Sequence, residues 1–227
     1  ARGPGRQTSS QFTDQGAPMN WLIHNYAWVL ELLGQHLVIA VSAIVVALVI
    51  SIPLGRAAVN SAFGRGLVSV VGAMYALPSL ALLILVPVII GTPLRSSLNM
   101  VIVLSIYGVA IMAGPCVQAF SGLPEQVLLS ADACGYGRLR RWWQIELPLA
   151  LAVIASAARV LVTSTISLVT VAAFIGISSL GTLLTDGFQR GISAEVITGL
   201  VATIILALLL DGLVALAHWL LSGWRRA

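Results

Sequence analysis

Five apolar runs in this sequence are each long enough to cross a lipid bilayer, and they leave few other architectures open. A spanning helix needs roughly 20 predominantly apolar residues to cross a hydrocarbon core of about 30 Å. Every backbone polar group must be paired inside that core, so runs of this length indicate helices. The sequence therefore predicts an all-α integral membrane protein with one transmembrane domain, residues 19–227, and spans at about 35–54, 66–90, 98–117, 148–175 and 196–221.

Composition supports a membrane protein and argues against a nucleic-acid-binding one. Hydrophobic residues make up 59% of the chain and charged residues only 9%, whereas soluble domains carry about 25% charged residues. The 12 basic residues are all arginines and the net charge is +4, which indicates arginines at loops rather than a basic binding surface. Residues 1–18 are polar and irregular, and we expect a disordered extension or an expression remnant there.

Two features modify the simple picture of five straight spans. The second run contains Pro78 and Pro87, and proline removes a helix hydrogen bond, so this span is expected to be kinked or split. Residues 20–33 are mixed in polarity and carry Trp21 and Trp28. They resemble an interfacial lead-in to the first span rather than a part of it.

The arginines predict the orientation of the spans, because cytoplasmic loops of membrane proteins carry an excess of basic residues. With the extension set aside, seven arginines fall on one side and two on the other. The richer side is therefore cytoplasmic, with the amino terminus outside and the carboxyl terminus inside. It carries Arg56, Arg65, Arg138, Arg140, Arg141, Arg225 and Arg226, and the opposite side carries Arg95 and Arg190.

The longest cytoplasmic loop, about residues 118–147, contains a predicted short helix in "LPEQVLLSADACGYG". Pro124 suits the first position of a helix, and Gly135 or Gly137 suits its end. One face is apolar through residues at helical spacing. Such a face lies either on the bilayer surface or in a groove of another protein. The face consists of Val127, Leu128, Ala131 and Cys134.

The spacing within this loop resembles the permease signature of binding-protein-dependent ABC importers, E-A-A-x-x-x-G followed after nine residues by I-x-L-P. Gly135 and the "IELP" that begins at Ile145 match that spacing, but Leu129 stands where the motif has its glutamate and Asp132 is the nearest acidic residue. The resemblance implies a coupling helix, residues 123–137, that docks into the ATPase subunit. It assigns coupling to Val127, Leu128, Leu129, Ser130, Ala131, Asp132, Gly135, Ile145, Leu147 and Pro148.

Further segments are similar to the osmoprotectant branch of these permeases over about residues 20–222, among them "ALPSLALL", "AAFIGISSLGTLLTDG" and "LALLLDGL". The resemblance implies a type I ABC importer permease for glycine betaine, choline or carnitine, in a bacterial plasma (inner) membrane. It implies an ATPase that holds ATP and Mg, a second identical or homologous permease and an extracytoplasmic binding protein. Methionine-importer permeases share the five-helix plan and remain an alternative, as does a stand-alone channel or secondary transporter.

Two charges, Arg159 and Asp211, fall within predicted spans, where a charge costs at least about 2.5 kcal/mol. Both lie roughly 15 to 17 Å from the cytoplasmic end at 1.5 Å per residue. Equal depth permits a buried ion pair that holds the fourth and fifth spans together. The alternatives are that one or both face the translocation path, or that they snorkel.

Other candidates for the translocation path come from irregular or polar positions at membrane depth, where ordinary packing is an equal alternative. These are Tyr75, Pro78, Ser79 and Tyr107. By resemblance, part of an external gate falls between the fourth and fifth spans, where a plain connecting turn is the alternative. The gate residues are Ser178, Ser179, Leu180 and Gly181.

The sequence predicts no enzyme. A chain without lysine has no Walker-type ATP site, and neither a nucleophile motif nor metal-ligand spacing occurs. We therefore expect no cofactor, no metal and no catalytic residue in this chain, with the energy for transport supplied by a partner.

Overall fold

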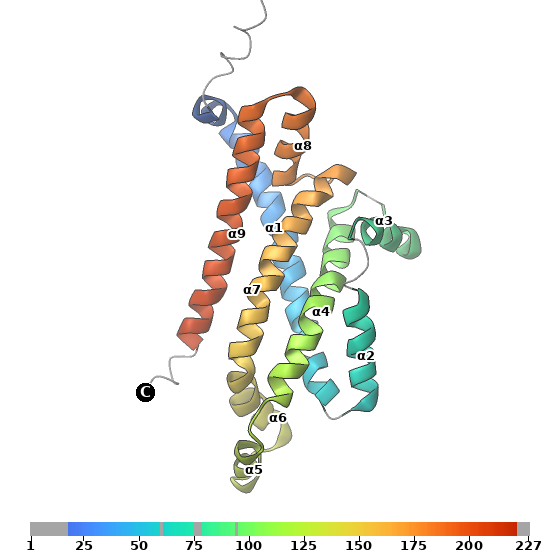
Figure 1. The fold of residues 1–227 in the computed structure, drawn as a ribbon, viewed down its shortest axis with the longest axis vertical. Helices are drawn as coiled ribbons and strands as arrows, with labels where there is room; N and C mark the ends of the chain where they lie inside the picture. Colours follow the sequence, from blue (N-terminus) through green and yellow to red (C-terminus); the bar gives the residue numbers. More distant parts are fainter. Residues whose placement is uncertain (1–17, 60, 75–78, 94, 222–227) are drawn as a thin grey trace, which may run out of the picture.

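The computed structural model describes residues 18–59, 61–74, 79–93 and 95–221, and this described part is helical throughout, as predicted (Figure 1). A π-helical turn, Trp142–Glu146, and a 3₁₀ turn, Ala172–Ile175, join some of the α-helices. The α-helices are α1 (Pro18–Val59), α2 (Ala62–Ala73), α3 (Ser79–Ile90), α4 (Ser97–Ser121), α5 (Glu125–Ala133), α6 (Arg138–Arg141), α7 (Leu147–Val171), α8 (Leu180–Arg190) and α9 (Ser193–Leu221).

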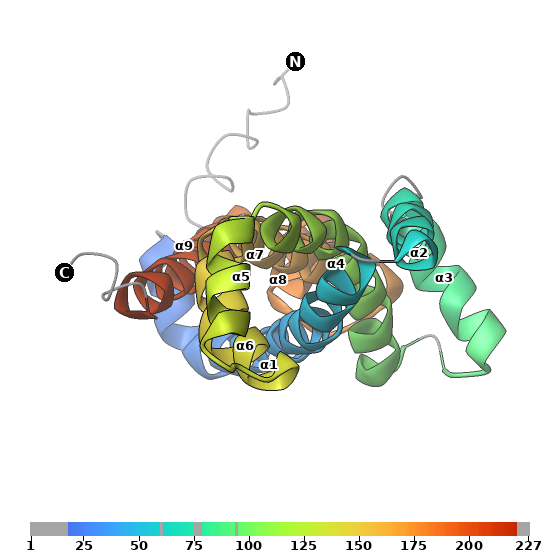
Figure 2. The ribbon, with the colours of Figure 1, turned by 90° about the horizontal axis from the view of Figure 1, so that it is seen from below.

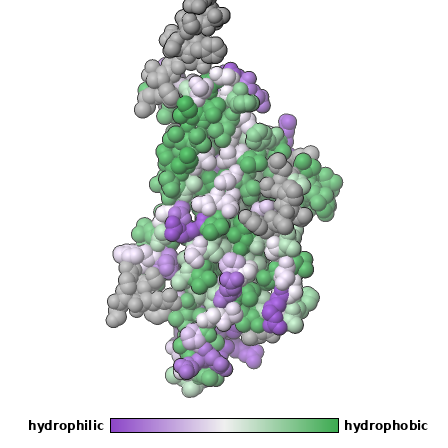
Figure 3. Space-filling model, in the orientation of Figure 1, coloured by the Kyte–Doolittle hydropathy of each residue, from purple (hydrophilic) through white to green (hydrophobic). Residues whose placement is uncertain are grey.

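Four helical segments in the described part of the chain are long and apolar enough to span a membrane. Their exposed side chains include many large aliphatic ones, such as Leu208, Leu209 and Leu213 on α9. Figure 3 shows apolar side chains over much of the surface, with hydrophilic ones gathered at the end where α5 and α6 lie. The segments are Trp21–Val59, Ser97–Ser121, Arg138–Ile175 and Ser193–Leu221.

The first helix is longer than the span that the sequence predicts. Residues 20–33 belong to the same helix as that span, because α1 runs without a break from Pro18 to Val59 over 42 residues. Val29 and Leu32 are buried in the same apolar core as Ile44, so packing against the bundle extends the helix. The extension expected at residues 1–18 lies outside the described residues except for Pro18.

Two short helices, α2 and α3, occupy the region expected to form one kinked or split span. Each has 12 residues and is too short to cross the bilayer alone. Pro87 lies inside α3, whereas Pro78 lies outside the described residues. Both helices lie on one side of the bundle in two perpendicular views (Figures 1 and 2).

The centre of the bundle consists of α1, α4 and α7, with α9 against α7. Gly108 of α4 lies where these three helices meet, because a Cβ placed on it would come within 2.6 Å of Ala47 Cβ and 2.9 Å of Leu161 Cδ1. Small residues allow helix backbones to approach closely in this way in membrane proteins. The bundle therefore fixes the ends of α1 and α7, which carry the candidate site.

Candidate functional site

The predicted loop helix exists as α5 and projects beyond the bundle at its lower end (Figures 1 and 2). Pro124 is its N-cap residue, and Gly135 follows its end with φ +78°. The amide of Gly135 donates to the Asp132 carbonyl and that of Tyr136 to the Ala131 carbonyl. This pairing is a Schellman motif, whose left-handed position favours glycine, and it explains why the signature has a glycine here.

The exposed face of α5 differs from the face expected from the sequence. Ala131 is only 5% exposed and Leu128 is half-buried, so these two side chains turn toward the protein itself. Leu129 is 60% exposed, and Val127 and Ser130 are also exposed. The surface open to a partner is therefore centred on Leu129, the position at which the signature has its glutamate.

A π-helical turn connects the loop to the next span. Residues 138–171 form one continuous helix in which Pro148 lies near the start of α7. Proline donates no amide hydrogen bond and crowds the preceding turn. The helix widens just before it, so that the Leu147 amide donates to the Trp142 carbonyl, five residues back. Such π-bulges often mark functional segments.

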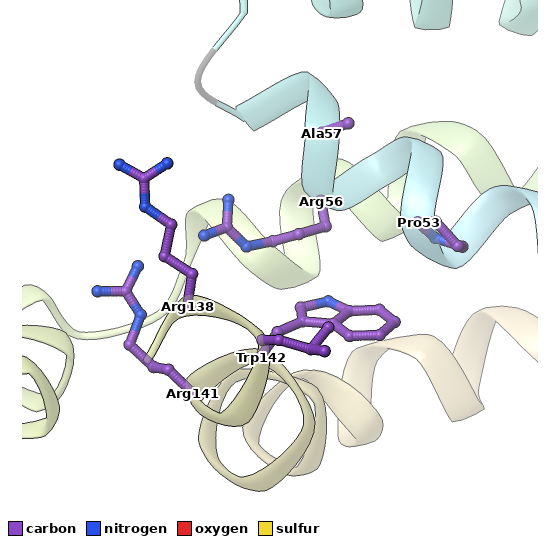
Figure 4. A pocket seen from close by; sticks show the side chains of 7 residues that line it. Pro53, Arg56, Ala57, Arg138, Arg141 and Trp142 are labelled. Atoms are coloured by element: carbon purple, nitrogen blue, oxygen red, sulfur yellow. The ribbon is translucent and has the colours of Figure 1, made fainter. Parts of the chain in front are cut away.

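This widened turn buries the carboxylate of Glu146, which is 1% exposed. It accepts hydrogen bonds from Arg56 Nε, from Arg56 Nη2 at 3.1 Å and from Arg141 Nε at 2.9 Å. Arg56 comes from the end of α1, 90 residues away, and Figure 4 shows it reaching toward the segment that carries Arg141. One carboxylate therefore joins α1, α6 and the start of α7.

The same network extends into α5. Arg141 Nη1 lies 2.6 Å from both carboxylate oxygens of Asp132. Asp132 is thus paired with an arginine of its own chain, and its role in coupling stays a prediction. A continuous chain of ion pairs runs from Asp132 through Arg141 and Glu146 to Arg56, and we call it the Glu146 network.

The charges expected at membrane depth lie together in the structure. Arg159 donates from Nε to Asp211 Oδ1 at 2.7 Å and from Nη2 to Asp211 Oδ2 at 2.6 Å, which is a two-pronged pair between α7 and α9. Within this single chain the pair is only partly buried, because the Arg159 side chain is 52% exposed and that of Asp211 20%, which leaves Arg159 accessible as the path-facing alternative requires. Figure 3 shows hydrophilic atoms interrupting the apolar surface over α7 and α9.

Exposed hydroxyl groups continue along α7 from this pair. Ser156, Thr163 and Ser167 recur at helical spacing and are all exposed, so they share one face with Arg159. Each donates to a carbonyl of its own helix, which leaves its oxygen free to accept from outside. We call this the polar face of α7. Beside it lies a hollow of about 340 Å³, lined by Tyr107, Thr163, Ser164, Ser167 and Leu168.

The expected gate residues cap and pack the start of α8. Ser179 and Thr182 form a capping box, and Ser179 Oγ also donates to the Val169 carbonyl. Ser179, Leu180 and Gly181 are buried, and only Ser178 of the four is exposed. The segment connects α7 to α8 in this way, and its role in an external gate stays a prediction. Tyr75, Pro78 and the side chain of Ser79 lie outside the described residues.

Sequence reasoning missed the roles of Arg56 and Glu146. The available signals were an acidic residue inside the I-x-L-P segment and an arginine at the end of the first span, but nothing in the sequence pairs them. Among the described residues, no three His, Cys, Asp or Glu side chains gather closely enough to hold a metal ion.

Comparison with known proteins places this arrangement among transport proteins. The chain is 32% identical over 191 residues to the osmoprotectant import permease protein OsmY of Salmonella typhimurium, covering 81% of this chain and 78% of the relative. It is 28% identical over 204 residues to the glycine betaine/carnitine/choline transport system permease protein OpuCB of Bacillus subtilis, covering 88% and 91%.

The fold has a solved counterpart as well. A chain of the inward-facing MetNI methionine ABC transporter matches with a TM-score of 0.75 at 19% identity, covering 91% of this chain and 99% of that one. At this identity the likeness concerns the fold alone. The family model described as "Binding-protein-dependent transport system inner membrane component" matches residues 43–222. The chain therefore belongs to this family of inner membrane permeases of binding-protein-dependent ABC importers.

Proposed function

We propose that this chain is the permease subunit of an ATP-driven importer of osmoprotectants, small quaternary amines such as glycine betaine, choline or carnitine. The carrying observation is the similarity, over most of the chain, to permeases named for these solutes in Bacillus subtilis and Salmonella typhimurium. The methionine alternative is supported only by the likeness of fold. Family membership favours an importer component over a stand-alone channel or secondary transporter.

In this proposal α5 is the element that docks onto the ATPase, on the cytoplasmic side, with the amino terminus of the chain outside. Its exposed apolar residues Val127 and Leu129 lie at the projecting end of the molecule. A short helix with an exposed apolar face suits recognition in a groove. The Glu146 network ties this helix to α1 and α7, so a displacement of α5 is passed to two spanning helices.

A second permease, identical or homologous, completes the translocation path. Charged and hydroxyl side chains at membrane depth normally face protein or water, because contact with hydrocarbon leaves them unsatisfied. The polar face of α7 and the Arg159–Asp211 pair meet this condition if a second subunit faces them across a wet path. Exposed leucines of α9 such as Leu208 face the lipid instead.

Uptake by the reconstituted importer tests the proposed solute. We expect proteoliposomes that hold this chain, its partner permease if one exists, its ATPase and its binding protein to accumulate labelled glycine betaine only with ATP on the ATPase side. Choline or carnitine should compete and methionine should not. Accumulation without ATP would contradict an importer, and an ATPase-active complex indifferent to these amines would keep the importer but discard the osmoprotectant.

Docking through α5 predicts the effect of a charge on its exposed face. Val127→Asp should lower the affinity for the ATPase subunit by roughly tenfold, because Val127 is an exposed apolar residue of α5 and the new carboxylate would be desolvated in an apolar groove. Phe188→Asp is a matched control, since Phe188 is also an exposed apolar residue but lies on α8 at the opposite end of the molecule. Pull-down of the ATPase measures both, and equal binding by the two variants would refute the docking role.

The Glu146 network predicts a loss of both stability and coupling in Glu146→Gln. Removing the charge takes from Arg56 its charged partner in the network and leaves Arg141 with Asp132 alone, and hydrogen bonds to charged groups are worth about 1.5–3 kcal/mol each. We expect a lower unfolding temperature of the purified complex and fewer solute molecules moved per ATP hydrolysed. Glu31→Gln, the same change at an exposed carboxylate that accepts a hydrogen bond from Gln35, should change neither by much. A wild-type transport ratio in Glu146→Gln would contradict a coupling role.

Thiol accessibility tests the polar face of α7. In a Cys134→Ser background, where Cys116 is buried, Thr163→Cys and Ser167→Cys in the complex should react with a membrane-impermeant thiol reagent. Leu208→Cys on α9 should react at least about tenfold more slowly, because the thiolate that reacts needs a wet environment. Equal protection of all three thiols would show that the polar face does not line a wet path.

A further inference from the structure

A hollow of about 740 Å³ lies beside the Glu146 network, between the end of α1 and the α6 segment. Its walls combine basic groups with apolar ones, and Figure 4 shows the arginine side chains reaching into the same region from two elements. The coupling role described above uses the paired arginines of the hollow's wall but leaves the space itself, and Arg138, without a role. The hollow is lined by Pro53, Arg56, Ala57, Arg138, Leu139, Arg141 and Trp142.

The arginines of the hollow differ in whether their guanidinium groups are already paired with a carboxylate of the chain. Arg56 and Arg141 are held in place by Glu146 and Asp132, so their guanidinium groups are fixed at the wall. Arg138 has no ion pair or hydrogen-bond partner for its side chain among the described residues, and it is exposed. It is therefore available to an external anion, at a site whose other cations are already positioned.

Basic groups outnumber acidic ones at the hollow. Arg140 lies on the same short helix and donates to Gln144 Oε1, a neutral acceptor. Three arginines line the hollow, and the carboxylates paired with them among the described residues are Asp132 and Glu146. Guanidinium groups bind phosphate oxygens with paired hydrogen bonds, which makes a phosphate-bearing anion the best-fitting ligand chemistry.

The level of the hollow in the bilayer identifies the source of that phosphate. Pro53 belongs to the apolar part of α1, and Arg56 follows at its end. Trp142 lines the hollow and packs edge to face against Trp143, with ring centroids 4.6 Å apart, and tryptophans are enriched at the headgroup level of membranes. A hollow with an apolar floor and a basic rim at this level suits a lipid better than a soluble protein, and basic pockets at the cytoplasmic ends of spanning helices bind anionic headgroups.

We propose that this hollow binds the phosphate of an anionic phospholipid of the cytoplasmic leaflet, with Arg138 as its principal ligand and Arg56 and Arg141 as a fixed basic wall. Apolar contacts with Pro53, Ala57 and Leu139 accompany the glycerol and upper acyl region. The proposal rests on the membrane placement given under the proposed function, and it does not depend on which solute is carried.

Lipid binding to the purified complex tests the site without transport. The probes are phosphatidylglycerol and phosphatidylcholine, each titrated into the detergent-solubilised complex, with bound lipid counted by native mass spectrometry. Arg138→Gln should weaken phosphatidylglycerol binding at least about fivefold, because the Arg138 guanidinium lines the hollow and would pair directly with the phosphate, and leave phosphatidylcholine unchanged. Arg140→Gln is the matched control, since it removes the same charge from the same helix but does not line the hollow, and it should weaken binding less than Arg138→Gln does.

Three results would overturn the site. Equal loss of phosphatidylglycerol in both variants would indicate general surface charge. Protection against thermal unfolding by inorganic phosphate that requires Arg138 would indicate a soluble anion. Unchanged lipid binding in Arg138→Gln with weaker ATPase binding would assign the hollow to the ATPase. None of these readouts uses solute or uptake, so a failure of the osmoprotectant proposal would leave this result intact.

Discussion

The buried carboxylate of Glu146 organises the end of this protein at which α5 projects. Glu146 has almost no exposed surface and lies between arginines from the end of α1 and from α6. A buried charge costs several kcal/mol unless it is paired and hydrogen-bonded, and removal of either partner leaves the remaining charge uncompensated. Glu146 and the two arginines therefore stabilise one another. Because these residues lie on α1, on α6 and just before α7, the positions of the three helical segments depend on one another.

The local backbone explains how this charge comes to be buried. Pro148 cannot continue a regular hydrogen-bond ladder, and the helix widens over Trp142–Glu146 just before it. An extra residue in that turn rotates the side chains that precede the proline, and Glu146 faces the bundle. The proline of the I-x-L-P segment thus determines the backbone path at the start of α7. The glycine of the loop ends α5. Together these two features set where α5 lies relative to α7.

The sequence predicted features that depend on neighbouring residues better than those that depend on distant ones. The apolar runs predicted α4, α7 and α9, and helix-end chemistry predicted α5, because these signals are local. The Arg56–Glu146 contact joins residues 90 positions apart, and no pattern in the sequence encodes that proximity. Arg159 and Asp211 were paired by equal depth alone, but their exposure depends on how α7 and α9 rotate, which only the packed bundle determines.

The exposure of the Arg159–Asp211 pair affects which groups a single chain presents to the lipid. Arg159 and the hydroxyls of Thr163 and Ser167 lie on the surface of α7, and Arg159 pairs with Asp211 of α9, whose other exposed side chains include leucines such as Leu208. Hydrocarbon satisfies the leucines and not the polar groups. Exchange of lipid contact for protein or water on the polar face of α7 would remove this cost, which gives the isolated chain a physical reason to associate through that face.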